Sequence, residues 1–135
     1  MQKKILVVDD APQIVGFLEK LLEHEGYEVF TALNGVDGIR LNEQENPDLI
    51  ILDLHMPGMD GVEVLRQVRW ADGKVKVIIL SGYVDDKVKK ETADLDVGKY
   101  LPKPFDSQQL FHAINNVLFL KVADELSAAE KQGGL

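Results

Sequence analysis

Residues 47–61 read Pro-Asp-Leu-Ile-Ile-Leu-Asp-Leu-His-Met-Pro-Gly-Met-Asp-Gly, and they are the strongest indication of the fold in this sequence. The apolar residues from Leu49 to Leu52 show no alternation of polar and apolar positions. A run of this kind is typical of a strand that is covered on both faces, as in a parallel sheet. The run ends directly at Asp53, where burial makes an ionised carboxylate costly. We therefore expect a buried strand with a candidate functional carboxylate at its carboxyl end.

Further segments rich in apolar residues predict four more strands. The five predicted strands cover residues 5–8, 27–31, 49–52, 75–80 and 99–101. Apolar residues with helical spacing follow several of these strands. They are Ile14, Leu18, Leu21 and Leu22, then Val62, Leu65 and Val68, and finally Leu110, Ile114, Val117 and Leu118. Strand alternating with helix five times predicts an α/β fold, with a doubly wound five-stranded parallel sheet, five helices and right-handed crossovers.

The carboxyl-terminal region predicts a long last helix. Asp106 and Gln109 have the spacing of a helix N-terminal capping pair, and nothing in residues 107–132 breaks a helix. At 1.5 Å per residue such a helix would be ~39 Å long, more than a short strand needs. We expect the domain at 1–121 and a helical extension or tail at 122–135. The extension could be a fraying end, an interaction segment or the start of a linker.

Composition and charge narrow the classes of function. The chain has 135 residues, of which 45% are hydrophobic and 28% charged, as in a single globular domain. A net charge of −8 argues against binding to nucleic acid, and the absence of cysteine excludes disulfides and thiolate zinc sites. No apolar run approaches the ~20 residues that cross a bilayer, and the amino terminus lacks a signal-peptide core. We expect a cytoplasmic protein that binds neither nucleic acid nor membrane.

Polar side chains follow the predicted strands where each strand ends. Asp9 and Asp10 follow the first strand, Asp53 the third, Ser81 the fourth and Lys103 the fifth. Ligands of parallel α/β sheets bind at the carboxyl ends of the strands, so these groups are expected to meet at one edge. Three clustered carboxylates repel each other unless a cation balances them, and Mg²⁺ with its preference for oxygen ligands fits best.

The same residues suggest a reaction. An ionised aspartate such as Asp53 can attack phosphorus and form an acyl phosphate. The ammonium group of Lys103 and the hydroxyl of Ser81 could stabilise the phosphoryl oxygens. Each residue also has a structural interpretation: Asp9 and Asp10 as helix caps, Lys103 as surface charge, Ser81 as part of a turn. The functional interpretation rests on their convergence at consecutive strand ends.

The chain resembles the receiver domain of two-component response regulators from about Lys3 to about Leu120. The resemblance is carried by four motifs, which lie at residues 5–10, 47–61, 79–82 and 100–105. They read ILVVDD, PDLIILDLHMPGMDG, ILSG and YLPKPF. The resemblance to the receiver domain implies a flavodoxin-like sheet with strand order 2-1-3-4-5.

The resemblance also implies roles for the site. Asp53 would be phosphorylated, and Asp10, Asp53 and the main-chain carbonyl of His55 would bind Mg²⁺, while Asp9 would hold a metal-bound water or assist the metal. Lys103 would pair with the phosphoryl group. The phosphoryl donor would be a phosphohistidine on a histidine kinase or a phosphotransfer domain. The protein would be no enzyme beyond self-catalysed phosphotransfer and slow autodephosphorylation.

The resemblance further implies a switch with a protein target. Ser81 would move to meet the phosphoryl group, and Tyr100 would then turn inward and change a protein-binding surface. The resemblance therefore implies a downstream protein partner. A homodimer could form through the fourth helix, fifth strand and fifth helix, or through the carboxyl-terminal helix. His55 and Tyr83 are bulky where the family tunes hydrolysis, which predicts slow loss of the phosphoryl group. Asp96 stands in the turn before the last strand and predicts a shifted turn there.

Two other classes remain open on the sequence. An aspartyl-phosphate phosphatase also places an aspartate after a strand, but His55 stands two residues after Asp53, where such an enzyme needs a second carboxylate as general acid. A receiver-like interaction module that has lost phosphorylation is the second alternative. Against it, the three aspartates, Ser81 and Lys103 are all present.

Overall fold

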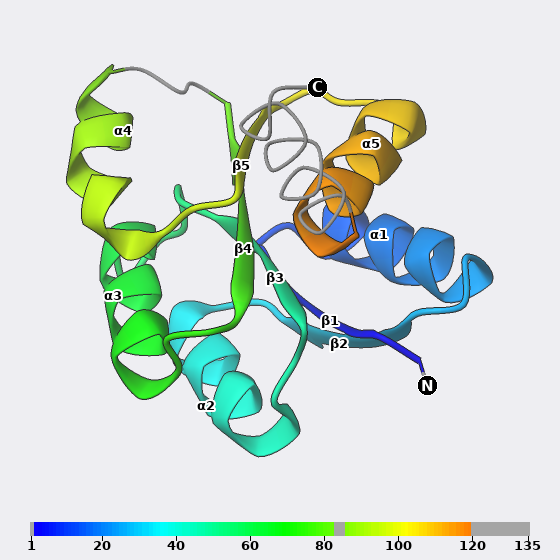
Figure 1. The fold of residues 1–135 in the computed structure, drawn as a ribbon, viewed down its shortest axis with the longest axis horizontal. Helices are drawn as coiled ribbons and strands as arrows, with labels where there is room; N and C mark the ends of the chain where they lie inside the picture. The colour runs from blue at the N-terminus through cyan, green and yellow to red at the C-terminus, as the bar shows by residue number, and fades with distance from the viewer. Residues whose placement is uncertain (1, 83–85, 120–135) are drawn as a thin grey trace, which may run out of the picture.

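The computed structural model describes residues 2–82 and 86–119, and their centre is a parallel sheet with the strand order β2-β1-β3-β4-β5. Helices cover both faces of the sheet (Figure 1). The strands are β1 (Lys4–Val8), β2 (Glu28–Ala32), β3 (Leu49–Asp53), β4 (Lys76–Ser81) and β5 (Lys99–Pro102). The helices are α1 (Pro12–His24), α2 (Gly35–Glu45), α3 (Gly61–Ala71), α4 (Asp86–Thr92), the 3₁₀ turn η1 (Ala93–Leu95) and α5 (Ser107–Leu118). The predicted fold class and strand order are confirmed.

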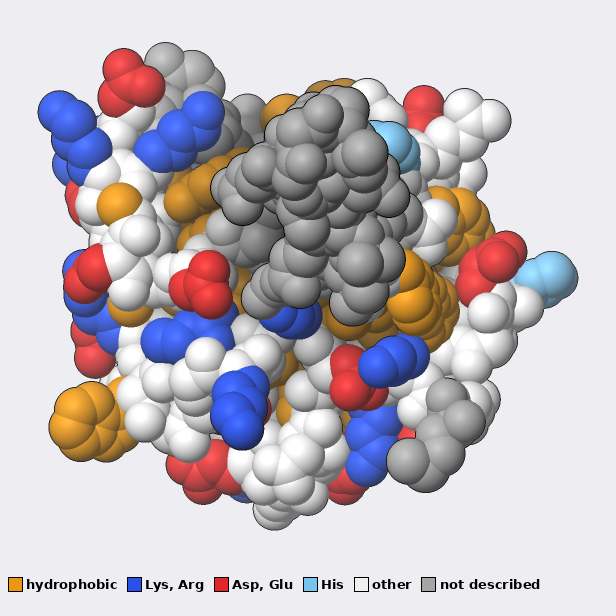
Figure 2. All heavy atoms as spheres, viewed as in Figure 1, with side chains coloured by type: hydrophobic (Ala, Val, Ile, Leu, Met, Phe, Trp, Pro, Cys, Tyr) orange, Lys and Arg blue, Asp and Glu red, His pale blue; other side chains and the backbone are white. Residues whose placement is uncertain are grey.

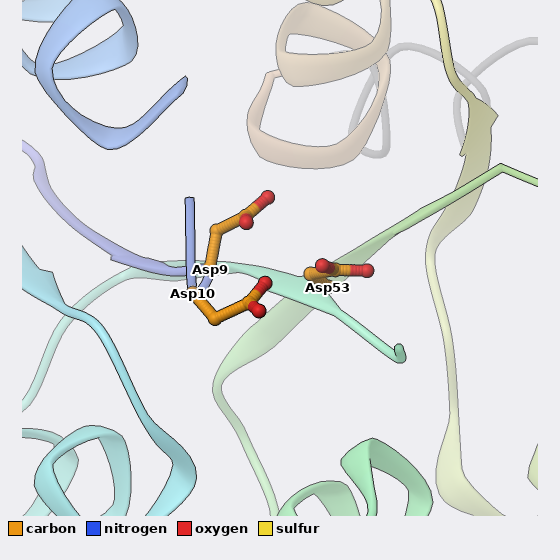
Figure 3. Close-up of side chains that lie close together, drawn as sticks. All are labelled: Asp9, Asp10 and Asp53. Atoms are coloured by element: carbon orange, nitrogen blue, oxygen red, sulfur yellow. The ribbon is translucent and has the colours of Figure 1, made fainter. Parts of the chain in front are cut away.

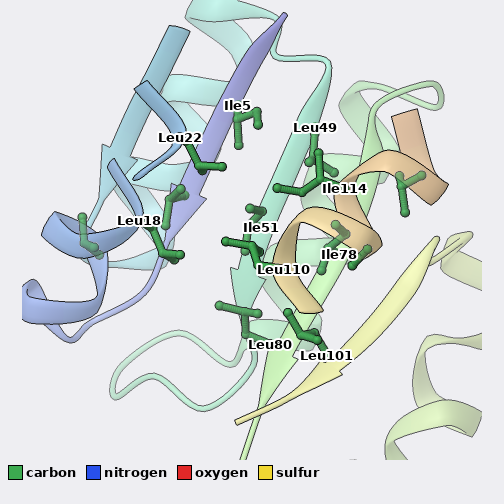
Figure 4. Close-up of a cluster of buried hydrophobic side chains, with 14 residues drawn as sticks. Ile5, Leu18, Leu22, Leu49, Ile51, Ile78, Leu80, Leu101, Leu110 and Ile114 are labelled. Carbon is green, nitrogen blue, oxygen red and sulfur yellow. The ribbon is translucent and has the colours of Figure 1, made fainter. Parts of the chain in front are cut away.

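Two hydrophobic layers explain why the strands lack alternation. Successive side chains of a strand point to opposite faces, so Ile5 of β1 joins the layer under α1 and α5, and Leu6 joins the layer under α2 and α3. Figure 4 shows the first layer, where Leu18 of α1 and Ile114 of α5 point toward the strands. Full burial of one such side chain contributes about 1.5–3 kcal/mol, so the two layers together hold the strand ends in fixed register.

Local signals set the helix boundaries. Pro12 occupies the first turn of α1, where a missing N–H costs nothing. The side chain of Asn34 accepts a hydrogen bond from the backbone N–H of Asp37 and caps α2. The predicted pair of Asp106 and Gln109 forms a reciprocal capping box at the start of α5.

Several details differ from the sequence predictions. Val15 of α1 is buried, whereas Ile14 is only partly buried, because the helix is rotated slightly from the predicted stripe. In α3 the apolar spacing predicted that Val62 would be buried, but Val64 is buried and Val62 is only partly buried. The last helix is described to Leu118, and its predicted extension at 122–135 lies outside the described residues. Over residues 2–82 and 86–119, no helix is long and apolar enough to span a bilayer.

The turn before β5 contains a residue in a left-handed conformation. Asp96 adopts a left-handed conformation with φ 53°, and the strand follows it. Arg69 of α3 holds this turn in place, because its guanidinium donates to the carbonyl oxygens of Leu95 at 3.0 Å, Asp96 at 3.3 Å and Val75 at 2.8 Å. The chain thereby enters β5 in register with β4.

Candidate functional site

Three carboxylates meet at the carboxyl edge of the sheet, where the sequence predicted them. Each of Asp9, Asp10 and Asp53 offers a carboxylate oxygen, and these oxygens lie within 4.8 Å of one another. Figure 3 shows the side chains of Asp9 and Asp10 approaching Asp53 from the end of β1. Asp9 and Asp53 are buried, with 0% and 3% exposure, whereas Asp10 is exposed. The cluster thus has two desolvated members and one that opens to solvent.

Backbone hydrogen bonds orient the two buried carboxylates. Oδ1 of Asp9 accepts from the backbone N–H of Ala11 at 3.0 Å, and Oδ1 of Asp53 accepts from the N–H of His55 at 3.0 Å. The N-cap of α1 is Ala11, which provides no side-chain cap, so Asp9 and Asp10 are not helix N-caps. Asp9 instead fixes the turn that leads into α1. The second oxygen of each carboxylate is left to face the cluster.

Lys103 supplies the counter-charge from the loop after β5. Its Nζ lies 2.9 Å from Oδ2 of Asp9 and 3.3 Å from Oδ2 of Asp53. The lysine side chain is only 23% exposed, so its interpretation as plain surface charge is wrong. Its backbone N–H donates to the carbonyl of Ser81 at 2.7 Å, and a cis peptide bond joins it to Pro104. One ammonium group therefore bridges two buried carboxylates.

Burial and charge act in opposite directions on this cluster. Burial raises the pKa of Asp53, the charge of Asp9 raises it further, and the N–H of His55 and the ammonium of Lys103 only partly offset this rise. Burial lowers the pKa of Lys103, but the two aspartates outweigh it and the net pKa is raised. Lys103 therefore does not fully offset burial and the charge of Asp9 at Asp53, and a cation bound beside these carboxylates would favour the ionised form.

Ser81 lies beside the cluster at the end of β4. It is fully buried, and its hydroxyl oxygen is 3.0 Å from Nε2 of His55. The sequence analysis gave His55 roles through its main-chain carbonyl and through the bulk of its side chain, so the contact of that side chain with Ser81 is a new feature of the site. Tyr83, the other bulky residue predicted to slow hydrolysis, lies outside the described residues.

The loop from β3 to α3 shapes the remaining wall of the site. Gly58 has φ +88°, and a Cβ at Gly61 would lie 2.4 Å from Cα of Leu54, so the loop folds tightly against the end of β3. The side chain of Asp60 accepts from the N–H of Val62 at 2.8 Å and starts α3. Gly61 thus lets the start of α3 lie close to Leu54, the residue after Asp53.

Comparison with known families agrees with this geometry. The sequence profile of the response regulator receiver domain matches residues 5–115. The chain belongs to this family. Receiver domains are signalling phosphoacceptor domains and not conventional enzymes, and they typically bind Mg²⁺.

Individual relatives support the family assignment. The receiver domain is 36% identical over 121 residues to sporulation initiation phosphotransferase F of Bacillus subtilis (strain 168), covering 90% of this chain and 98% of that protein. It is also 36% identical over 118 residues to the alkaline phosphatase synthesis transcriptional regulatory protein PhoP of that organism, covering 87% of this chain and 49% of PhoP. This chain therefore spans about half the length of PhoP.

Solved structures show the same fold. Chemotaxis protein CheY4 of Vibrio cholerae aligns with a TM-score of 0.84 at 29% identity, covering 87% of this chain and 100% of that chain. In this receiver domain helices cover the two faces of the sheet, and the carboxyl edge holds the acidic cluster (Figures 1 and 3).

The predicted switch aromatic lies apart from the cluster in this receiver domain. Tyr100 of β5 is half-buried and packs against the layer under α2 and α3. Its hydroxyl is hydrogen-bonded to the hydroxyl of Thr92, the last residue of α4. Thr92 is fully buried. The sequence analysis did not single out Thr92, because a lone threonine in a polar helix carries no local signal of such a contact.

Charges of both signs lie on the surface of α3 and α4 (Figure 2). Figure 2 shows lysine and arginine side chains interspersed with acidic ones over α3 and α4 on the face in view. Two ion pairs there, Arg66 with Asp94 at 3.6 Å and Lys87 with Glu91 at 3.9 Å, join groups that are largely exposed and contribute little to stability.

Proposed function

We propose that this receiver domain accepts a phosphoryl group on Asp53 from a phosphohistidine of a histidine kinase or a phosphotransfer domain. The observation that carries the proposal is the placement of Asp53, whose buried carboxylate lies 3.3 Å from the ammonium of Lys103 and within 4.8 Å of the carboxylates of Asp9 and Asp10. A nucleophile, a cationic partner for phosphoryl oxygens and an oxygen-rich cation site thus stand side by side.

The step itself needs little covalent chemistry from the protein. A carboxylate oxygen of Asp53 forms a bond to phosphorus while the P–N bond of the phosphohistidine breaks, and the released imidazole keeps the electron pair. Lys103 turns from the carboxylate toward the phosphoryl oxygens and stabilises their charge. Ser81, beside the same edge, supplies a hydroxyl that can move to donate to one of those oxygens.

The donor set fits Mg²⁺. Three carboxylates with one bridging ammonium leave an excess of negative charge, and oxygen ligands are those that Mg²⁺ prefers. Asp10, Asp53 and the main-chain carbonyl of His55 would hold the ion directly, and Asp9 would hold a water bound to it or assist the metal. When bound, the ion neutralises charge on the phosphoryl oxygens.

Phosphorylation is proposed to act through a protein surface. It adds about −1.5 to −2 charge at Asp53, which draws Ser81 and Lys103 toward the new group. Tyr100 then changes position and alters the surface formed by α4, β5 and α5, where a downstream protein or a second copy of the chain would bind. The domain boundary at 121, the cytoplasmic location and the identity of the partners stay predictions.

Intact-mass measurement after treatment with acetyl phosphate and Mg²⁺ tests the proposal. We expect the mass to rise by one phosphoryl group, the adduct to be absent in Asp53→Asn, and loading to be strongly reduced in Asp10→Asn or in the presence of a chelator. Asp94→Asn, which changes an exposed carboxylate of η1, is the matched control and should load like the wild type. An adduct that persists in Asp53→Asn would refute the proposal.

A further inference from the structure

We propose that Thr92 is a positioning residue that holds the switch aromatic Tyr100 away from Ser81 in the unphosphorylated protein. The inference rests on the proposed function, since it concerns the equilibrium that phosphorylation of Asp53 shifts. The observation behind it is a chain of hydrogen bonds that links β5 to α4 at the far end of that helix.

The direction of the hydrogen bonds follows from the number of protons. The hydroxyl of Thr92 donates its one proton to the carbonyl oxygen of Val88 at 2.8 Å, one helical turn earlier. Its oxygen then accepts from the phenol O–H of Tyr100. Thr92 is fully buried, so the phenol finds its partner at a place without solvent that could replace it. The tyrosine is therefore tied to the main chain of α4 through one side chain.

The path of the chain from β4 through α4 to β5 shows how the hydrogen bond between Tyr100 and Thr92 affects the switch. Ser81 ends β4, and α4 runs back alongside the sheet from that edge, so Thr92 at its last residue lies at the end of the helix remote from Ser81 (Figure 1). Tyr100 pairs with Ile79, two residues before Ser81, so it lies on the strand that neighbours the end of β4. A phenol bonded to Thr92 points to the remote end. Movement of Tyr100 toward Ser81 must break this bond.

The hydrogen bond consequently opposes the switch. A buried hydrogen bond that exists in only one of two states favours that state by about fivefold in population. Removal of the Thr92 hydroxyl should therefore make the activated state easier to reach. Ligands that select this state, including phosphoryl mimics at Asp53, should bind more tightly by the same factor.

The test is the affinity of the full chain for beryllofluoride at saturating Mg²⁺. Thr92→Val keeps the shape and removes the hydroxyl, and we expect its affinity to rise about fivefold. Thr92→Ser keeps the hydroxyl and should stay near the wild-type value. Tyr100→Phe removes the same bond from the other side and should also raise the affinity, while the double variant should gain no more than either single variant.

The outcomes separate the two proposals. Unchanged or weaker binding in Thr92→Val with normal uptake by the wild type would contradict the role of Thr92 alone, and so would additive effects in the double variant. A wild-type chain that takes up no beryllofluoride would contradict the proposed function and the role of Thr92 with it. If Thr92→Val fails to fold, Tyr100→Phe decides, because unchanged affinity there also contradicts the proposal.

Discussion

The imidazole Nε2 of His55 lies 3.0 Å from the hydroxyl oxygen of Ser81, and so links the loop after β3 to the end of β4. The backbone N–H of the same histidine donates to Oδ1 of Asp53 at 3.0 Å. His55 thus contacts the candidate phosphorylation site with its main chain and the candidate switch hydroxyl with its side chain. The ring of His55 therefore lies next to the switch hydroxyl, in a residue whose main chain contacts Asp53.

The first prediction concerns the lifetime of that group. His55→Ala removes the ring and its contact with Ser81, and we expect the phosphoryl group to be lost severalfold faster because water gains access to the acyl phosphate. Intact mass followed over time after removal of acetyl phosphate measures the decay. His112→Ala, which changes an exposed histidine of α5, should decay like the wild type. Equal decay in His55→Ala would show that the ring does not shield the site.

The second prediction concerns pH and Asp53. Burial raises the pKa of Asp53 in the folded state. At pH values between the unfolded-state and folded-state pKa, Asp53 therefore keeps its proton in the folded protein but loses it in the unfolded chain. This group's contribution to stability therefore falls as pH rises from about 3.9, the ordinary value of aspartate, through the raised folded-state pKa. Asp53→Asn removes the loss, and we expect it to be more stable than the wild type at neutral pH without divalent cations.

Urea unfolding at several pH values in a chelator measures this effect. Glu23→Gln, which neutralises an exposed carboxylate of α1, is the control and should leave the pH profile of the wild type intact. Added Mg²⁺ should stabilise the wild type more than Asp53→Asn, because it binds the folded site. A wild type and an Asp53→Asn variant with the same stability at pH 4 and pH 7 would contradict the prediction.

The third prediction concerns the bridging ammonium. Lys103→Met leaves the buried carboxylates of Asp9 and Asp53 without their cation, and loss of one partner of a buried ion pair costs about 3 kcal/mol of unfolding free energy. Mg²⁺ should restore part of this loss, since it supplies positive charge to the same oxygens. Denaturant unfolding with and without Mg²⁺ measures both effects. Lys20→Met on the exposed face of α1 should change neither, and an equally small effect of Lys103→Met would rule out a stabilising bridge.

The fourth prediction concerns the turn before β5. Arg69→Ala leaves the carbonyl oxygens of Val75, Leu95 and Asp96 without their charged donor. Because hydrogen bonds to charged groups are the stronger ones, we expect a loss of about 3 kcal/mol in the free energy of unfolding. Arg40→Ala is the control, because its ion pair with Asp37 is exposed and should contribute about 0.5 kcal/mol or less. Similar stabilities of the two variants would mean that the turn holds without Arg69.

Local patterns in the sequence were enough for the sheet and for the members of the site. Continuous apolar runs such as residues 49–52 report burial on both faces, and parallel topology then brings the ends of β1, β3, β4 and β5 to one edge. The acidic cluster of Asp9, Asp10 and Asp53 follows from that placement without knowledge of any side-chain contact. The error of one position at Val15, where Ile14 was expected to be buried, arose because the helical period fixes a stripe only to within a fraction of a turn.

Tertiary packing sets which side chains are in contact within the site and around Tyr100. The bridge from Lys103 to two carboxylates, the contact of His55 with Ser81 and the bond between Tyr100 and Thr92 each join residues from different strand–helix units. Their existence depends on how far each loop reaches and how each helix is rotated against the sheet, which the packing of the two hydrophobic layers sets as a whole. Periodicity within one segment carries no information on that rotation. These three contacts could therefore be identified only from the packed structure.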